Sequence, residues 1–154
     1  MELKEEAVRA VLISIKNCSK ESDDGKINPF NYAVAINKIE DSKDYSKAEL
    51  YYAFELLFQE NMYFNIVDNP SYDHNGNLDY VRLRGLTVNG HELCKNLENP
   101  SVFKAVKEKA KKVGGFGIKT IASTCTVVAT ALMNDPNSIN NLVEGVKNIT
   151  GMVK

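Results

Sequence analysis

A histidine and a cysteine near the middle of the chain are of the residue types that form a base and a nucleophile. His91 stands beside Glu92 and three positions before Cys94. A cysteine nucleophile needs a base within hydrogen-bond reach to remove its proton. Two residues three positions apart at the start of a helix more often reflect packing than catalysis. We therefore expect a non-catalytic protein, with no catalytic residue to assign.

The stretch around Gly76 places oxygen donors at alternate positions, as calcium-binding loops do. The pattern fails at both ends, because Ser71 stands at the first ligand position and Arg82 at the twelfth, where such loops have a bidentate glutamate. Asn75-Gly76 is a strong turn signal, since both residue types tolerate a positive φ. We expect a plain turn and no metal. The donors between the two ends are Asp73, Asn75, Asn77 and Asp79.

Other patterns also argue against a phosphate-binding loop, a disulfide framework and a zinc site. The glycine-rich stretch 114–117 lacks the lysine and the serine or threonine that follow in phosphate-binding loops. The cysteines, Cys18, Cys94 and Cys125, are isolated and odd in number, so they predict neither a disulfide framework nor a paired zinc site. We expect no cofactor and no small-molecule substrate. These cysteines and the charged, acidic N-terminus, which is unlike a signal peptide, favour a cytoplasmic protein.

The net charge of −1 conceals a basic segment. Residues 101–119 carry six lysines and one glutamate, whereas the sequence before them is mildly acidic. Nucleic acid, an anionic membrane or an acidic protein surface would suit such a segment, and a solvated helix face is the plain alternative. The candidate residues for binding nucleic acid or another anionic surface are Arg82, Arg84, Lys104, Lys107, Lys111 and Lys112.

The best-defined element of the chain is a helix over residues 46–61. Ser46 followed three residues later by Glu49 is a capping box, in which the hydroxyl and the carboxylate each satisfy a backbone N–H. Apolar residues then recur at three- and four-residue spacing, which predicts the face that meets the core. These core residues are Leu50, Ala53, Phe54, Leu57 and Phe58.

The opposite side of this helix is the candidate partner-binding surface. Lys47 is the one basic residue of the helix. Affinity for DNA rests largely on phosphate contacts from Lys and Arg, which an acidic helix opposes. The surface therefore favours a protein partner. Its candidate residues are Tyr51, Tyr52, Glu55 and Gln59.

Shorter elements surround this helix. A helix over 4–17 precedes it. Residues 32–39 fit either a helix or a strand, because β-branched residues alternate there as in a strand. We favour a helix, since a winged helix needs one at this position. Strands over 63–67 and 79–83 predict a hairpin whose long connection is the wing. Thr87 begins a further helix, in which Gly90 allows a neighbouring backbone to approach closely.

The C-terminal part is predicted to be a helical extension. A lysine-rich helix begins at residue 99, the glycines at 114–117 form a hinge, and apolar helices follow over 118–133 and from 137 onward. The apolar faces of this helical hairpin need a partner, so we expect a homo-oligomer. The run 118–133 is shorter than the roughly 20 residues that cross a bilayer.

These patterns together predict an α+β, mainly helical fold. Residues 1–98 form a winged helix-turn-helix domain, and residues 99–154 form the extension, made of the basic helix, the glycine hinge and the apolar helical hairpin. The content of 44% hydrophobic and 25% charged residues is that of an ordinary globular protein, so we expect a buried core.

The run Leu86–Leu93 and the lysine-rich stretch 99–115 resemble a family of uncharacterised bacterial and prophage proteins related to YjcQ-like winged-helix proteins. The shared pattern is leucine-threonine, two residues, glycine-histidine, a short acidic connection and a lysine-rich helix that ends in glycines. The resemblance covers roughly residues 1–117. Departures are Val88 and Val102, where aromatics are expected, and the long loop around Asp23. The resemblance implies a winged helix in a phage or prophage setting and brings no catalytic residues.

The sequence leaves three functions open. The first is a protein-interaction or regulatory module that uses the surface around Tyr52 and self-associates through its C-terminal helices. The second is a DNA-binding transcriptional regulator that uses Arg82, Arg84 and the lysine helix. The third is a membrane-associated protein attached through residues 101–133. We favour the first, because the surface of the capped helix is too acidic for a phosphate backbone.

Overall fold

The structure, a computed structural model, describes residues 1–19, 24–113 and 117–134. It confirms the predicted α+β class: the described chain is 59% helical and carries small antiparallel sheets. The chain divides into two units, Met1–Cys94 and Lys95–Lys154. The boundary falls inside helix α4 (Val88–Glu98). The domain boundary at residue 98 stays a prediction.

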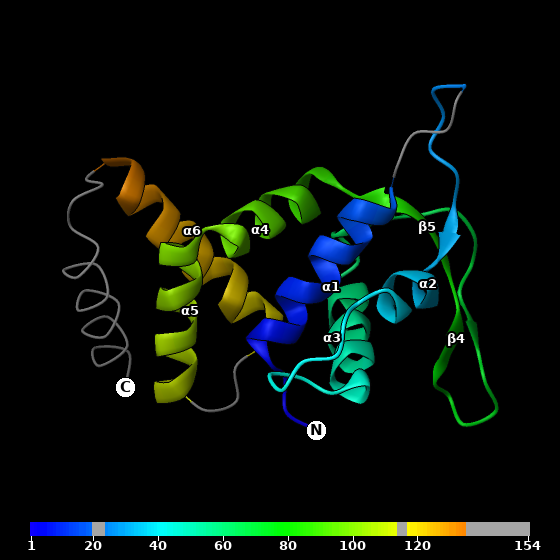
Figure 1. The fold of residues 1–154 in the computed structure, drawn as a ribbon, viewed down its shortest axis with the longest axis horizontal. Coiled ribbons are helices and arrows are strands. Elements are labelled where there is room, and N and C mark those ends of the chain that lie inside the picture. Colours follow the sequence, from blue (N-terminus) through cyan, green and yellow to red (C-terminus); the bar gives the residue numbers. More distant parts are fainter. Residues whose placement is uncertain (20–23, 114–116, 135–154) are drawn as a thin grey trace. The chain divides into compact units, whose positions relative to one another are not determined.

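The first unit contains three helices, two small sheets and the beginning of α4 (Figure 1). Its core is built on the pair α1 and α3, which pack against each other. The elements before α4 are, in chain order, α1 (Glu5–Cys18), β1 (Phe30–Asn31), α2 (Tyr32–Asn37), α3 (Lys47–Gln59), β2 (Phe64–Ile66), β3 (Ser71–Tyr72), β4 (Leu78–Tyr80) and β5 (Arg82–Leu86).

Helix α3 turns its apolar stripe inward, as predicted. Leu50 is 2% exposed and Phe54 is fully buried. The ring of Phe54 stacks on Tyr32 at 4.5 Å and on Phe64 at 4.9 Å between centroids, so α3 is fixed to α2 and to the sheet by one aromatic cluster. The side of α3 opposite Phe54 is therefore left to face outward.

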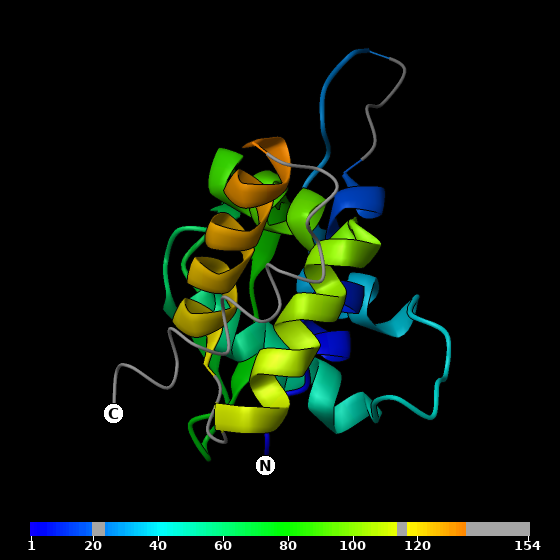
Figure 2. The ribbon, with the colours of Figure 1, turned by 90° about the vertical axis from the view of Figure 1, so that its left-hand side faces the viewer.

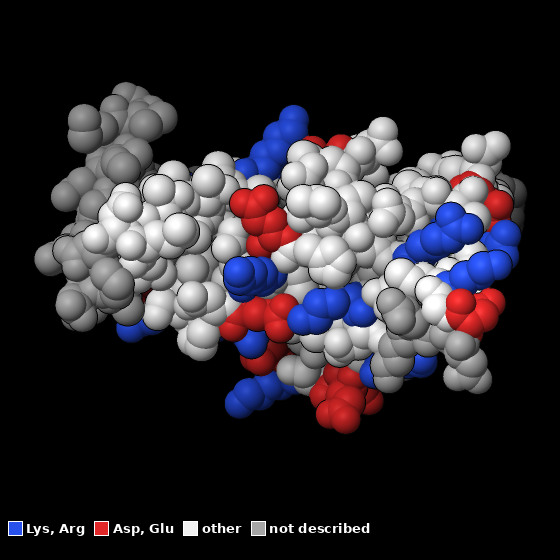
Figure 3. Space-filling model, turned by 90° about the horizontal axis from the view of Figure 1, so that it is seen from above, with Lys and Arg blue, Asp and Glu red and all other residues white. Residues whose placement is uncertain are grey.

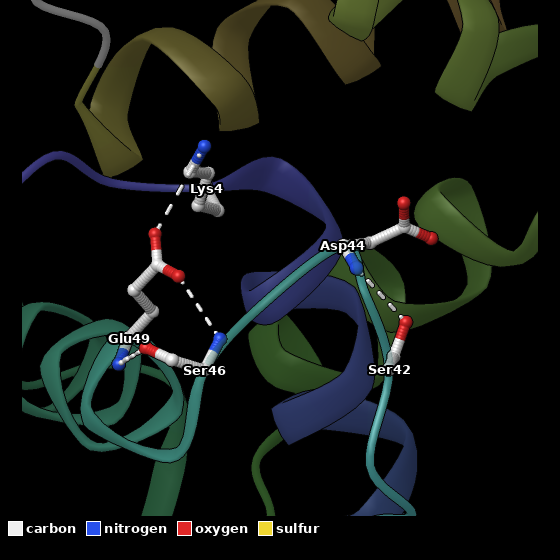
Figure 4. A network of polar contacts seen from close by, with 5 residues as sticks. All are labelled: Lys4, Ser42, Asp44, Ser46 and Glu49. Carbon is white, nitrogen blue, oxygen red and sulfur yellow. Dashed lines mark hydrogen bonds and ion pairs between the residues drawn. The ribbon is translucent and has the colours of Figure 1, made fainter.

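The start of α3 is held by the predicted capping box (Figure 4). The Ser46 hydroxyl accepts a hydrogen bond from the Glu49 N–H at 3.1 Å, and the Glu49 carboxylate accepts one from the Ser46 N–H at 2.9 Å. Lys4 lies 4.0 Å from the same carboxylate. These bonds satisfy N–H groups that a helix start leaves without partners.

The sheet differs from the predicted hairpin in one respect. The single strand expected over 79–83 is two strands, β4 and β5, separated by Val81. Val81 is fully buried, and its carbonyl accepts a hydrogen bond from the Tyr32 N–H at 3.1 Å. This bond continues the pairing of β1 with β5 one position beyond Asn31 and Arg82. β5 pairs with β1 and β2, in the order β1-β5-β2, while β4 pairs with β3 in a separate hairpin.

The other predicted elements of this unit are confirmed. The helix expected over 4–17 is α1, and the ambiguous run 32–39 contains α2, directly after the short strand β1. Helix α4 begins after Thr87, whose hydroxyl accepts a hydrogen bond from the Gly90 N–H at 3.1 Å. This bond caps α4 in the way that the sequence predicts.

The second unit contains helices α5 (Pro100–Val113) and α6 (Ile118–Asn134), which pack side by side (Figure 2). Asn99 begins α5, because its side-chain oxygen accepts a hydrogen bond from the Ser101 N–H at 2.9 Å. Val106, Ile121 and Cys125 are fully buried. Among the described helices, none is long and apolar enough to cross a membrane. Residues 114–116 of the predicted hinge and the helix predicted from 137 lie outside the described residues.

Candidate partner-binding surface

The outer side of α3 carries the four residues that the sequence singles out. Tyr52, Glu55 and Gln59 recur at three- and four-residue spacing and so share one face of the helix. Gln59 is exposed, whereas Tyr52 and Glu55 are half-buried. Tyr51 lies at the edge of this face, because its ring meets Tyr32 edge-on at 5.9 Å between centroids.

The C-terminal half of this face forms a hollow with the β3–β4 hairpin. We call it the α3–hairpin groove, and its volume is about 310 Å³. Two of its residues, Glu55 and Gln59, are predicted from the sequence. The groove is lined by Glu55, Phe58, Gln59, Asn61, Tyr72, Gly76 and Leu78.

The remaining lining residues are missed because the sequence does not show where the hairpin folds. Tyr72 belongs to β3, which is too short to be recognised among polar loop residues. Phe58 was predicted to be a core residue, but it is half-buried and also lines the groove. The signal that could have found Tyr72 is Asn75-Gly76, because a tight turn there brings the residues before it next to those after it.

The hairpin is fixed to the core at its base and closed by a carboxylate at its tip. The Tyr32 hydroxyl donates a hydrogen bond to the Leu78 carbonyl at 2.9 Å. One oxygen of Asp73 accepts hydrogen bonds from the N–H groups of Asn75 and Asn77, each at 2.9 Å, and Gly76 adopts a φ of +83°. Asp73 thus serves the turn, as in other turns stabilised by an aspartate side chain.

The groove has a negative electrostatic environment. Burial, followed by the charges of Tyr51, Glu55 and Asp79, raises the pKa of Tyr32 to about 12. The negative charges of Glu55 and Asp79 therefore both act on the Tyr32 phenol, whose hydroxyl binds the base of the hairpin. Among the lining residues that the structure describes, none is lysine or arginine.

A second hollow, of about 560 Å³, lies beside α1 and α2. Ala10, Ile13 and Ile39 contribute its apolar lining, and Lys38 and Glu40 contribute charges of opposite sign. None of the predicted partner-binding residues contributes to it. The predicted surface and this hollow are therefore separate.

The candidate nucleic-acid residues are divided between the two units. Arg82, on β5, forms an ion pair and a hydrogen bond with Asp68, and this contact raises the pKa of the guanidinium. Arg84, on the same strand, is exposed. Figure 3 shows one face of the molecule, on which Lys and Arg side chains lie next to Asp and Glu side chains. Acidic side chains next to basic ones weaken an attraction for phosphate.

The candidate lysine residues of α5 are exposed or half-buried. Lys104, Lys111 and Lys112 are exposed, and Lys107 is half-buried. The Lys107 ammonium lies 5.5 Å from the centre of the Phe103 ring, a cation–π contact. The described part of α5 therefore presents a basic face, as its sequence predicts.

The histidine and the cysteines that the sequence singles out differ in their exposure to solvent. His91 is exposed, whereas Cys94 is 1% exposed. Burial raises the pKa of the Cys125 thiol to about 12, which keeps it in the unreactive thiol form. Within residues 1–19, 24–113 and 117–134, no three His, Cys, Asp or Glu residues are grouped so that they could hold a metal ion.

Comparison with known sequences finds one family. The sequence model of the family described as "Hypothetical protein (DUF2513)" matches residues 2–117. The match includes the whole α3–hairpin groove and the basic helix α5. Comparison with curated proteins and with solved structures finds no match.

Proposed function

The chain belongs to the DUF2513 family of hypothetical proteins, and we propose that it is a non-catalytic protein-interaction or regulatory module that binds its partner through the outer side of α3 and the β3–β4 hairpin. The observation that carries this proposal is the α3–hairpin groove. It combines one carboxylate, two aromatic rings and two amide side chains beside an exposed helix face. Aromatic residues beside polar groups are typical of protein interfaces.

The winged helix-turn-helix assignment is part of the proposal. Its support is the order of elements in the first unit: a helix, a short strand, two helices and then the strands β2 to β5, of which β2 and β5 pair with each other. In the three-stranded sheet the last strand, β5, lies between β1 and β2. Winged helices have this order, with the helix before the hairpin as the recognition helix. The β3–β4 hairpin would then be the wing. The relation to YjcQ-like proteins and the phage or prophage setting stay predictions.

A protein partner suits this surface better than DNA does. In a DNA-binding member of this fold class the recognition helix enters the major groove, between phosphate backbones that attract cations and repel carboxylates. Here the corresponding side of α3 presents Glu55, and Arg82 on the neighbouring sheet is already paired with Asp68. A fold alone does not fix a function, so the site residues decide between the two classes.

A pull-down with the full chain tests this proposal. Replacing Tyr52 and Glu55 by alanine should abolish capture of the partner, because both side chains stand on the proposed contact face. The control is a double replacement of Val88 and Glu92, which are exposed on α4. Capture that survives the first double replacement, or that is lost equally in the control, would reject this surface.

We also propose that the C-terminal helices mediate self-association. The support is exposed apolar surface on α6, where Val127 is 52% exposed and Met133 is 84% exposed. Light scattering of the full chain should show an oligomer that dissociates on Val127→Asp. Val88→Asp is the matched control, because Val88 is an equally apolar, exposed helix residue. A wild-type chain that scatters as a monomer would overturn this part of the proposal.

A further inference from the structure

We infer that the α3–hairpin groove receives an arginine side chain of the partner protein. This inference rests on the proposed function and names the chemistry of the contact. Three observations carry it: the size of the groove, the sign of its charges and the presence of flat aromatic surfaces. Each is a property of residues in the first unit alone.

The size of the groove suits a single long side chain better than a whole helix. Its volume of about 310 Å³ is at the lower end of the range for small-molecule pockets. A helix has a diameter of about 10 Å or more and would not enter it. The groove therefore suits one projecting side chain of a partner whose remaining surface lies on the outer side of α3.

The charges around the groove select a cation. Glu55 contributes a carboxylate, and Gln59 and Asn61 contribute amide groups whose oxygens can accept hydrogen bonds from a cation. These residues also stand at the C-terminal end of a 13-residue helix, where the helix dipole places partial negative charge. A phosphate or carboxylate ligand would be repelled by this arrangement.

The backbone conformation at the end of α3 leaves Asn61 in the lining of the groove. Asn61 adopts a φ of +56°, the left-handed conformation that ends a helix, and its N–H donates to the Phe58 carbonyl at 3.0 Å. Asparagine tolerates this conformation better than most residues that have a side chain. The chain therefore leaves the helix at Asn61 while the Asn61 side chain lines the groove.

The aromatic rings favour arginine over lysine. Phe58 is held by Phe54, with ring centroids 6.1 Å apart and planes 18° apart, and Tyr72 is 56% exposed at the other side of the groove. A guanidinium is planar and stacks on aromatic faces while its N–H groups donate to a carboxylate. A lysine ammonium is a compact, strongly hydrated charge and does not stack on aromatic rings as a planar guanidinium does.

A titration of the full chain followed by NMR tests the inference, with N-acetyl-arginine N-methylamide as the probe. We expect saturable shift changes at Glu55, Phe58 and Tyr72 with a dissociation constant on the order of 1 mM, as for a ligand of few atoms. The citrulline analogue, which has the same shape without the charge, should bind at least about tenfold more weakly. Glu55→Gln should weaken arginine binding by about tenfold, and the exposed control Glu92→Gln should leave it unchanged.

The inference would be overturned by equal binding of arginine and citrulline, by arginine-induced shifts located away from the groove, or by stronger binding of inorganic phosphate at the groove. An absence of shifts up to about 50 mM arginine probe would do the same. The pull-down separates this failure from that of the proposed function. If replacing Tyr52 and Glu55 abolishes capture but the arginine probe does not bind, the contact surface stands and only the arginine is wrong.

Discussion

The carbonyl oxygen of Tyr63 lies 2.3 Å from the position that a Cβ atom on residue 90 would take, so only glycine fits there. The same carbonyl accepts a hydrogen bond from the Thr87 N–H at 2.9 Å, and the Thr87 hydroxyl donates to the Met62 carbonyl. The start of α4 is thus joined directly to the segment between α3 and β2. The close backbone approach that the sequence predicts at Gly90 is confirmed.

Replacing Gly90 by alanine should destabilise the protein. In an ordinary helix this change stabilises by about 1 kcal/mol, because alanine has the higher helix propensity. Here the new methyl group would overlap backbone atoms that cannot move independently, so we expect a loss of about 3 kcal/mol in the free energy of unfolding. Urea unfolding measures it. Gly76→Ala is the control: its Cβ would meet no atom within 4 Å, and its φ of +83° alone should cost about 1 kcal/mol. An unchanged or raised stability of Gly90→Ala would contradict this packing.

Replacing Ser46 by alanine should cost about 1 kcal/mol of stability, because the first turn of α3 loses its cap. The control is Ser42→Ala, since the Ser42 hydroxyl accepts only a loop hydrogen bond, from the Asp44 N–H at 3.1 Å. Hydrogen bonds from Ser46 lower the pKa of Glu49 below its ordinary 4.5. The stabilisation by Glu49 is therefore present above pH 4.5 and lost as the pH falls through the lowered pKa. Equal effects of Ser42→Ala and Ser46→Ala would argue against the capping box.

Tyr32 should make the stability of the fold depend on pH in the alkaline range. Its pKa is raised from 10.0 to about 12, which favours the neutral phenol in the folded state. The stabilisation is therefore complete below pH 10 and is lost as the pH rises toward 12. Tyr32→Phe should lose about 1 kcal/mol at neutral pH, with the hydrogen bond to Leu78, and this deficit should shrink between pH 10 and 12. Tyr80→Phe, at an exposed tyrosine, is the control. A deficit that is constant with pH would contradict this role for the Tyr32 hydroxyl.

Local sequence signals predicted those features that depend on neighbours in the chain. The capping box at Ser46 and the burial of Leu50 and Phe54 follow from three- and four-residue spacing, which fixes both the start of α3 and its inner face. The cap of α4 at Thr87 follows in the same way. Such elements need no knowledge of the rest of the fold.

Features that depend on distant partners were predicted less well. At the break between β4 and β5 the Val81 carbonyl bonds to the Tyr32 N–H, 49 positions away in the chain. The α3–hairpin groove arises because Tyr72 and Leu78 are brought beside Phe58. The spacing of residues within one helix or strand predicts neither the bond between Val81 and Tyr32 nor the position of the hairpin beside Phe58. The sequence therefore predicted the side of the groove that α3 forms, through Glu55 and Gln59, but not the side that the β3–β4 hairpin forms.

Site-specific photo-cross-linking tests the central claim most directly. A photoreactive residue would replace Gln59, which is exposed at the groove, and in a separate chain Val34, which is 44% exposed on α2. The account predicts that the chain labelled at position 59 forms a covalent adduct with a protein partner and that the chain labelled at position 34 does not. Equal adducts from both positions, or adducts at position 59 with nucleic acid instead of protein, would contradict it.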